Sequence, residues 1–101
     1  MNTKNTSFEN LEKKYGQLSF GQTLKSWRMS EELTQKDFAN KLGISPQNLN
    51  DLEKERKIPS ATRASYFAKK LKVPELPLIR LALRDQLNQE GFKYDVILEV
   101  A

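Results

Sequence analysis

The stretch LTQKDFANKLGISPQNLNDLEKERKIPS, Leu33–Ser60, contains the pattern that decides the fold. It begins with Thr34, a residue type that caps the free N–H groups at the start of a helix. Apolar residues then repeat at helical spacing, which indicates one buried face: Phe38, Ala39 and Leu42. Gly43 follows directly, and glycine readily adopts the left-handed conformation that ends helices. We therefore predict a short helix that ends at this glycine.

A second helix is predicted immediately after the turn. Ser45 is a good N-cap, and Pro46 suits the first helical position, where no N–H is needed. The buried side consists of Leu49 and Leu52, with Ile44 before the cap able to pack on the first of these leucines. The exposed side carries short polar side chains that disfavour helix interiors: Gln47, Asn48, Asn50 and Asp51. Two short helices, a tight turn and a polar second helix are the geometry of a helix-turn-helix, which inserts its second helix into the major groove of DNA.

Further helices are expected on both sides of this motif. The residues Ser19–Ser30 place Phe20, Leu24 and Trp27 on one face, and core packing is the simplest interpretation of that stripe. Ser60 begins another helix with Ala64, Phe67, Ala68 and Leu71 inside. After the turn Val73–Pro77 comes a last helix, which reaches about Gln89 and has apolar residues on more than one face. Phe8, Leu11 and Tyr15 also allow a short helix near the N-terminus, after a polar stretch.

The end of the chain has a different pattern. In FKYDVILEV, residues 92–100, five apolar side chains alternate with other residues, which predicts a β-strand: Phe92, Tyr94, Val96, Leu98 and Val100. A single strand cannot satisfy its own backbone hydrogen bonds. We therefore expect it to pair with another chain or with its symmetry mate, or to remain a frayed tail.

Composition narrows the class of protein. The chain has 101 residues, which suits one domain, and it contains no histidine and no cysteine. Disulfides, cysteine-bound zinc and the commonest general base are thereby excluded. The four glycines make no phosphate-binding loop. We expect no enzymatic activity, no cofactor and no metal site.

The charge favours an anionic partner. The net charge is +4 and the pI is about 9.4, which is typical of nucleic-acid-binding proteins but also occurs in many cytosolic proteins by chance. Residues 76–101 carry three cations against four anions, so this part is a poor candidate for phosphate contact. There is no long apolar run and no secretory signal, so we expect a cytoplasmic protein without a membrane partner.

The residues of the central stretch resemble the Cro/repressor-type (Xre) helix-turn-helix family, from about Phe20 to Val73. The matching features run in register through the motif and into a basic loop: Gln35, Ala39, Gly43, Ile44, Ser45, Leu49, Leu52, Glu53, Pro59 and Ser60. The resemblance implies an all-α, lambda-repressor-like five-helix domain, to which the chain adds a C-terminal helix and the single C-terminal β-strand. The domains are then an N-terminal extension over 1–18, the DNA-binding domain over 19–73 and a dimerisation or partner-binding part over 74–101.

The resemblance also assigns roles to side chains. Base reading falls to Gln47, whose amide can bond adenine in bidentate fashion, and secondarily to Asn48 and Asp51. Phosphate contacts fall to Gln35, Ser45, Asn50, Lys54, Arg56, Lys57, Ser60 and Arg63. For the cations of the loop, a solvated position without DNA contact is the alternative. Arg28 and Glu53 match a buried structural salt bridge of the family.

Within the family, the two flanks, Glu9–Arg28 and Leu78–Ala101, are similar to Hig-like antitoxins of toxin–antitoxin pairs. This similarity implies a repressor of its own operon that also binds a toxin protein. Family members bind operator DNA as two-fold dimers, and the expected dimer or partner surface is Leu78, Leu81, Phe92, Tyr94, Val96 and Leu98. Two alternatives remain: a phage-type or chromosomal repressor without a toxin, and an interaction module that has lost DNA binding.

Overall fold

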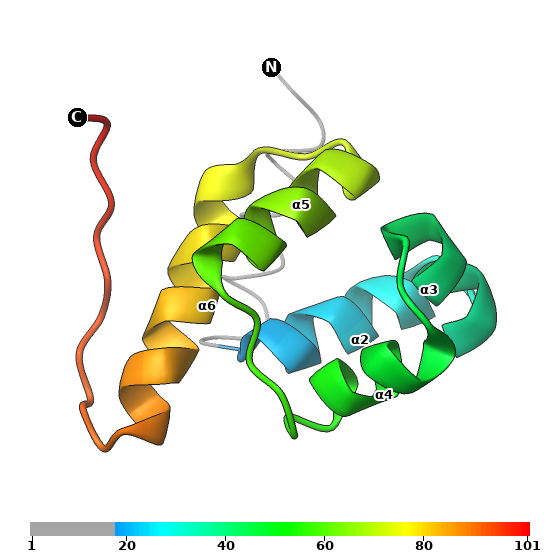
Figure 1. Ribbon diagram of the computed structural model, residues 1–101, viewed down its shortest axis with the longest axis horizontal. Helices are drawn as coiled ribbons and strands as arrows, with labels where there is room; N and C mark the ends of the chain where they lie inside the picture. The colour runs from blue at the N-terminus through cyan, green and yellow to red at the C-terminus, as the bar shows by residue number, and fades with distance from the viewer. Residues whose placement is uncertain (1–17) are drawn as a thin grey trace.

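The computed structural model describes residues 18–101 of the chain, and its regular structure is entirely helical. The described helices are α2 (Phe20–Ser30), α3 (Gln35–Leu42), α4 (Pro46–Glu53), α5 (Ala61–Leu71) and α6 (Glu75–Gln89). An extended segment, residues 92–101, follows and is called the C-terminal tail below (Figure 1). Except for Leu18, the predicted N-terminal extension with its possible short helix lies outside the described residues. No helix within residues 18–101 is long and apolar enough to cross a membrane.

Hydroxyl caps determine where four of the helices begin. Ser19, Thr34, Ser45 and Ser60 each precede a helix, and each hydroxyl accepts a hydrogen bond of 3.1 Å from the backbone N–H three residues later. Each such cap stabilises its helix by about 1 kcal/mol relative to alanine. The caps predicted at Thr34, Ser45 and Ser60 are thus confirmed, and they define the starts of the two motif helices and of α5.

The turn between α3 and α4 requires glycine for two reasons. Gly43 has φ +75°, in the left-handed region, and its N–H donates to the carbonyl of Asn40 at 3.2 Å. A Cβ at this position would also lie only 2.5 Å from the hydroxyl oxygen of Tyr66 on α5. The predicted left-handed stop is therefore confirmed, and a neighbouring helix closes the space around it.

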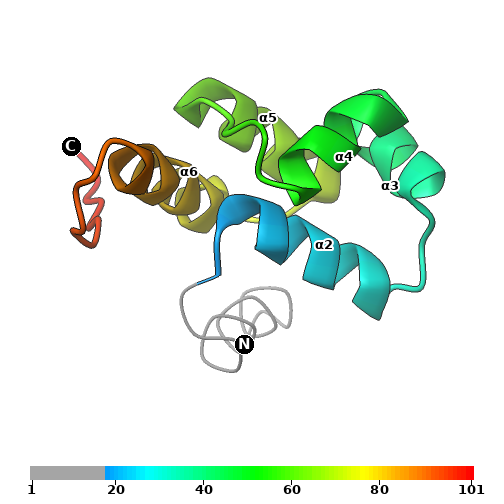
Figure 2. The same ribbon diagram turned by 90° about the horizontal axis from the view of Figure 1, so that it is seen from below.

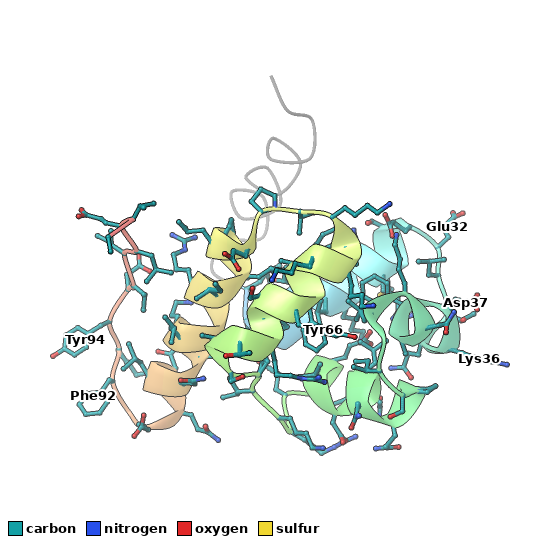
Figure 3. All side chains as sticks on the ribbon, turned by 45° about the horizontal axis from the view of Figure 1, so that its top comes forward. Glu32, Lys36, Asp37, Tyr66, Phe92 and Tyr94 are labelled. Atoms are coloured by element: carbon teal, nitrogen blue, oxygen red, sulfur yellow. The ribbon has the colours of Figure 1, made fainter. Side chains whose placement is uncertain are left out.

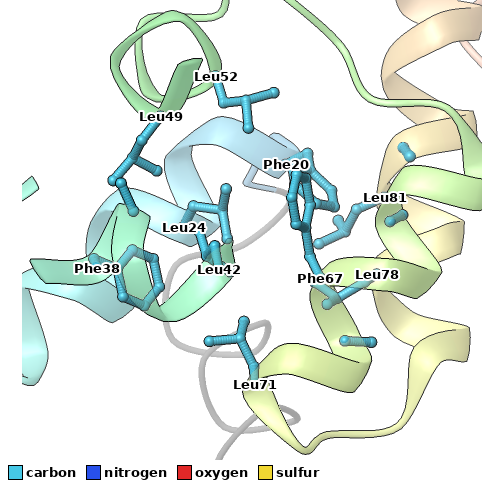
Figure 4. Close-up of a cluster of buried hydrophobic side chains, with 14 residues drawn as sticks. Phe20, Leu24, Phe38, Leu42, Leu49, Leu52, Phe67, Leu71, Leu78 and Leu81 are labelled. Carbon is cyan, nitrogen blue, oxygen red and sulfur yellow. The ribbon is translucent and has the colours of Figure 1, made fainter. Parts of the chain in front are cut away.

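One hydrophobic core joins all five described helices (Figure 4). Phe20 of α2 and Phe67 of α5 meet at its centre, with ring centroids 6.2 Å apart. The remaining buried apolar residues are Leu24, Phe38, Ala39, Leu42, Leu49, Leu52, Ala64, Ala68, Leu71, Leu78, Leu81 and Ala82. Because α3 and α4 both contribute to this core, the helix-turn-helix is anchored to the other described helices.

The last helix is part of this core, which corrects one expectation. Leu78 and Leu81 were expected on a dimer or partner surface, but their exposed fractions are 0% and 2%. They are buried because α6 packs against α5 and α2, and Asp85 of α6 also accepts a hydrogen bond of 2.8 Å from the N–H of Phe20. The core thus continues past residue 73, where the dimerisation or partner-binding part was expected to begin. α6 is the fifth helix of the described residues and packs into the same core as the other four.

The predicted C-terminal strand is wrong for this single chain. The tail is extended and runs back alongside α6 (Figure 1), but it forms no strand. Gly91, with φ +89°, turns the chain after α6, and the N–H of Phe92 donates to the carbonyl of Leu87 at 2.9 Å. Alternating apolar residues favour extended backbone, but a strand also needs a neighbouring strand as hydrogen-bond partner. The described part of the chain provides no such neighbour.

Candidate nucleic-acid interface

The second motif helix, α4, lies beside α3 at one end of the molecule, and the C-terminal tail lies at the opposite end (Figures 1 and 2). Leu49 and Leu52 bury the inner side of α4, and its first turn faces outward with Ser45, Pro46 and Gln47 exposed. Gly21 allows α2 to pass very close behind α4, because a Cβ there would lie 1.9 Å from the carbonyl oxygen of Leu52. The outer face of α4 is thus presented on a firmly supported helix.

Of the three predicted base readers, Gln47 is exposed and the other two are half-buried. The amide Nε2 of Gln47 donates to Oδ1 of Asp51 at 3.1 Å, one helical turn further along α4. Asn48 lies beside the groove between α4 and the start of α5, which is also lined by Lys57, Ser60 and Arg63. Gln47 is therefore the most accessible of the three side chains, and Asp51 is already engaged within the protein.

Asp51 is also the partner of two cations of the basic loop. Its Oδ1 accepts from Nε of Arg56 at 3.0 Å, and its Oδ2 lies 3.6 Å from Nζ of Lys57. The backbone of the loop supports this contact, because the N–H of Arg56 donates to the carbonyl of Asp51 at 2.9 Å. The hydrogen bond from Arg56 lowers the pKa of the Asp51 carboxyl, while desolvation opposes the shift and Gln47 adds to it. The carboxyl is thus held ionised beside the predicted base reader.

A buried polar network braces the motif from behind. Arg28 forms a two-pronged salt bridge with Glu53, with Nε–Oε2 at 2.7 Å and Nη2–Oε1 at 3.0 Å. Only 2% of the Glu53 side chain is exposed. Gln35 of α3 donates from Nε2 to Oε1 of Glu53 at 3.1 Å and to Oδ1 of Asn50 at 3.2 Å. The salt bridge expected from the resemblance is present, and Gln35, which was expected at a phosphate, links α3 to α4 within the protein.

The expected phosphate-binding side chains gather around α4 and the start of α5. Lys54, Arg56, Lys57, Ser60 and Arg63 are all exposed. Arg63 lies over the rings of Phe67 and Tyr66, with its guanidinium carbon 5.0 and 5.6 Å from their centroids. The amide of Gln86 on α6 donates to the carbonyl of Pro59 at 3.2 Å and so holds the loop from behind. These side chains are thus exposed to an approaching anion, although Arg56 and Lys57 already pair with Asp51, and the backbone that carries them is supported.

The C-terminal tail presents the other part of the expected partner surface. Phe92 and Tyr94 are 50% and 69% exposed, and their rings stack with centroids 6.4 Å apart. Both point away from the helices (Figure 3). Val96 and Leu98 are half-buried. The four tail residues therefore remain candidates for a partner surface, in contrast to Leu78 and Leu81.

Three contacts of this region were missed from the sequence. The Gln47–Asp51 pair has the i, i+4 spacing at which glutamine and aspartate interact on a helix, so that signal was present. The left-handed conformation of Glu55, with φ +61°, folds the basic loop back onto Asp51, and a glutamate gives no sign of it. Gly21, in the first turn of α2, carried a signal, because a glycine within a helical pattern often has a packing reason.

The comparison with known families agrees with this geometry. A helix-turn-helix family model matches residues 24–78, from α2 to the start of α6, which is more than half of the chain. No curated protein and no solved structure is significantly similar to the chain. The matched range contains α3, the Gly43 turn, α4, the basic loop and α5. The chain therefore belongs to the Cro/repressor-type (Xre) helix-turn-helix family of DNA-binding transcription regulators.

Proposed function

We propose that this protein is a sequence-specific repressor that inserts α4 into the major groove of operator DNA. The observation that carries the proposal is the exposed first turn of α4, with Gln47 outward and a cluster of exposed cations beside it. An amide bonds the N6 and N7 positions of adenine in bidentate fashion, so Gln47 is the principal reader. Asn48 and Asp51 lie further from the exposed edge of the helix and are secondary readers.

The cations and hydroxyls around α4 position the helix on the duplex. Lys54, Arg56, Lys57 and Arg63 contact phosphates, together with Ser45, Ser60 and the amides of Gln35 and Asn50. Phosphate contacts release counterions, so binding weakens steeply as the salt concentration rises. The recognition helix is supported by a packed core and flanked by a basic loop. This arrangement favours DNA binding over the two alternatives, an interaction module that has lost DNA binding and an enzyme.

The proposal is tested by fluorescence anisotropy with DNA from upstream of the protein's own gene, in a salt series, with a scrambled duplex as control. We expect specific, salt-sensitive binding that Gln47→Ala weakens by about 10- to 100-fold, as loss of a bidentate base contact of ~1–3 kcal/mol implies. Equal binding of both duplexes, unchanged by the variant, would contradict sequence reading by α4.

We further propose that the protein binds its operator as a homodimer. A single short helix reads only a few base pairs, and two-fold dimers of such proteins span half-sites about 34 Å apart. The exposed apolar residues of the tail support a second copy as the partner, because their backbone is extended and has no strand neighbour among the described residues. Pairing of two tails would provide the missing hydrogen bonds.

The narrower proposal is that the repressor is the antitoxin of a type II toxin–antitoxin pair and regulates its own operon. Its support is the similarity of the flanks to Hig-like antitoxins, together with the apolar tail as a protein-binding surface. The test is co-expression with the protein encoded beside its gene. Relief of growth arrest and a stable complex of the two purified proteins are expected. A neighbouring protein that is harmless when expressed alone would instead favour a repressor without a toxin.

A further inference from the structure

The carboxylate of Asp51 occupies a central position on the outer face of α4. It accepts hydrogen bonds from Gln47 and Arg56, at 3.1 and 3.0 Å, and lies 3.6 Å from the ammonium of Lys57. Its own side chain is only 14% exposed, whereas those of Arg56 and Lys57 are 50% and 60% exposed. The Asp51 carboxylate thus contacts a candidate base reader, Gln47, and two candidate phosphate-binding cations, Arg56 and Lys57.

The contact with Gln47 determines which way its amide faces. A carboxylate accepts hydrogen bonds and cannot donate them, so the NH₂ group of Gln47 must turn toward Asp51. The carbonyl oxygen and the second N–H then remain for a base. This is the donor and acceptor pair that bidentate contact with adenine requires. Without Asp51 the amide could turn over, and its oxygen and nitrogen would exchange places.

The contact with the cations has a second consequence. Non-specific binding depends on the number of phosphates that the protein neutralises, and each additional contact makes binding more salt-dependent. While Arg56 and Lys57 share the charge of Asp51, they attract a random duplex less strongly than two unpaired cations would. The same anion therefore orients the reader and restrains sequence-independent attraction.

We propose that Asp51 is the positioning residue that sets sequence discrimination, by orienting the Gln47 amide and by restraining Arg56 and Lys57. This inference rests on the proposed DNA-reading function, and it changes the role of Asp51 from a secondary base reader to a residue that acts through its neighbours. The protein then prefers one base over the others because the Gln47 amide is already oriented before it contacts DNA, so less entropy is lost on binding.

The experiment is selection of binding sites from a random duplex pool by the full-length wild type and four variants. Gln47→Ala identifies the base position that Gln47 reads, as the position at which the preference disappears. Asp51→Ala is expected to lose most of the preference at that same position. Asp51→Asn keeps an acceptor oxygen for the Gln47 amide, so it is expected to retain the preference. Glu90→Ala removes the same charge from an exposed position just after α6, outside both the tail and the helix-turn-helix motif, and is the charge control.

Affinity for a scrambled duplex provides the second measurement. Both Asp51 variants are expected to bind it about three- to tenfold more tightly than the wild type at ~100 mM salt, with a steeper salt dependence. Glu90→Ala should change neither quantity. Thermal unfolding of each variant shows whether the fold is intact before binding is compared.

Two results would overturn the inference while the proposed function stands. One is a wild-type base preference at the Gln47 position that Asp51→Ala leaves unchanged. The other is an equal weakening of specific and scrambled binding by Asp51→Ala, with an unchanged salt dependence, which would indicate a merely structural role. A selection in which the wild type itself recovers no preferred sequence would contradict the proposed function as well.

Discussion

At Gly21, the absence of a side chain determines how closely α2 approaches α4. A Cβ at this position would lie 1.9 Å from the carbonyl oxygen of Leu52, a backbone atom that cannot move without shifting the end of α4. We predict that Gly21→Ala lowers the free energy of unfolding by about 3 kcal/mol, at the upper end of the usual cost of overpacking. Urea denaturation measures this change. Gly91→Ala is the matched control, because it has no atom within 4 Å of an added Cβ and suffers only from its φ of +89°.

A second prediction at the residue scale concerns Asp85, whose carboxylate caps the N-terminus of α2. Burial raises the pKa of Asp85 above its ordinary value of 3.8, although the hydrogen bond from Phe20 opposes the shift. The folded state then binds more protons than the unfolded state between the two pKa values, so stability falls as the pH rises through that interval. Asp85→Asn keeps an acceptor for Phe20 and removes the charge.

Urea denaturation of both proteins between pH 3 and pH 7 tests this account of Asp85. We expect the stability of Asp85→Asn relative to the wild type to increase as the pH rises above 3.8 and then to level off above the raised pKa. A difference between the two proteins that does not depend on pH would show that the carboxyl titrates in the folded state as it does in the unfolded chain.

At the scale of elements, the prediction concerns α6. If α6 is part of the core, Leu81→Ala should lower the free energy of unfolding by about 2–5 kcal/mol, because its side chain is only 2% exposed and a cavity would remain. Leu76→Ala on the same helix is the control, since 42% of that side chain is exposed, and a change below about 1 kcal/mol is expected. Equal, small effects of both substitutions would mean that α6 is only loosely attached.

The elements also show what local sequence signals can and cannot predict. The starts of α3, α4 and α5 were predictable because each depends on a hydroxyl and an N–H three residues apart. The tail was assigned wrongly as a strand, because side-chain alternation says nothing about whether a hydrogen-bond partner exists. The apolar residues of α6 indicated two faces, but the pattern did not say which of them meets α5.

In the candidate site, too, local features could be predicted from the sequence, whereas contacts between distant residues could not. The exposure of Gln47 and the salt bridge between Arg28 and Glu53 could be expected, the first from helical periodicity and the second from the family resemblance. The convergence of Arg56 and Lys57 on Asp51 could not, because it depends on the left-handed backbone at Glu55. Which side chains face outward is a local property, whereas which of them meet depends on how the loop closes.

At the scale of the whole molecule, we expect the C-terminal tail to be needed for dimerisation but not for folding. The fold does not need the tail, since Ile97 and Val100 are 83% and 93% exposed and the core ends within α6. Deletion of residues 92–101 should therefore leave the melting temperature almost unchanged. If two tails pair in the dimer, the same deletion should yield a monomer in sedimentation equilibrium at micromolar concentration.

Loss of the dimer should then weaken operator binding by about 100-fold or more, because the second recognition helix is no longer held near its half-site. Phe92→Ser combined with Tyr94→Ser keeps the length of the chain and should have the same effect as the deletion, if the two stacked rings are the apolar centre of the contact. A deletion variant that sediments as a dimer would exclude the tail as the interface. The dimer contact would then have to lie on another exposed surface. The first candidate is Leu76 and its neighbours on the outer side of α6.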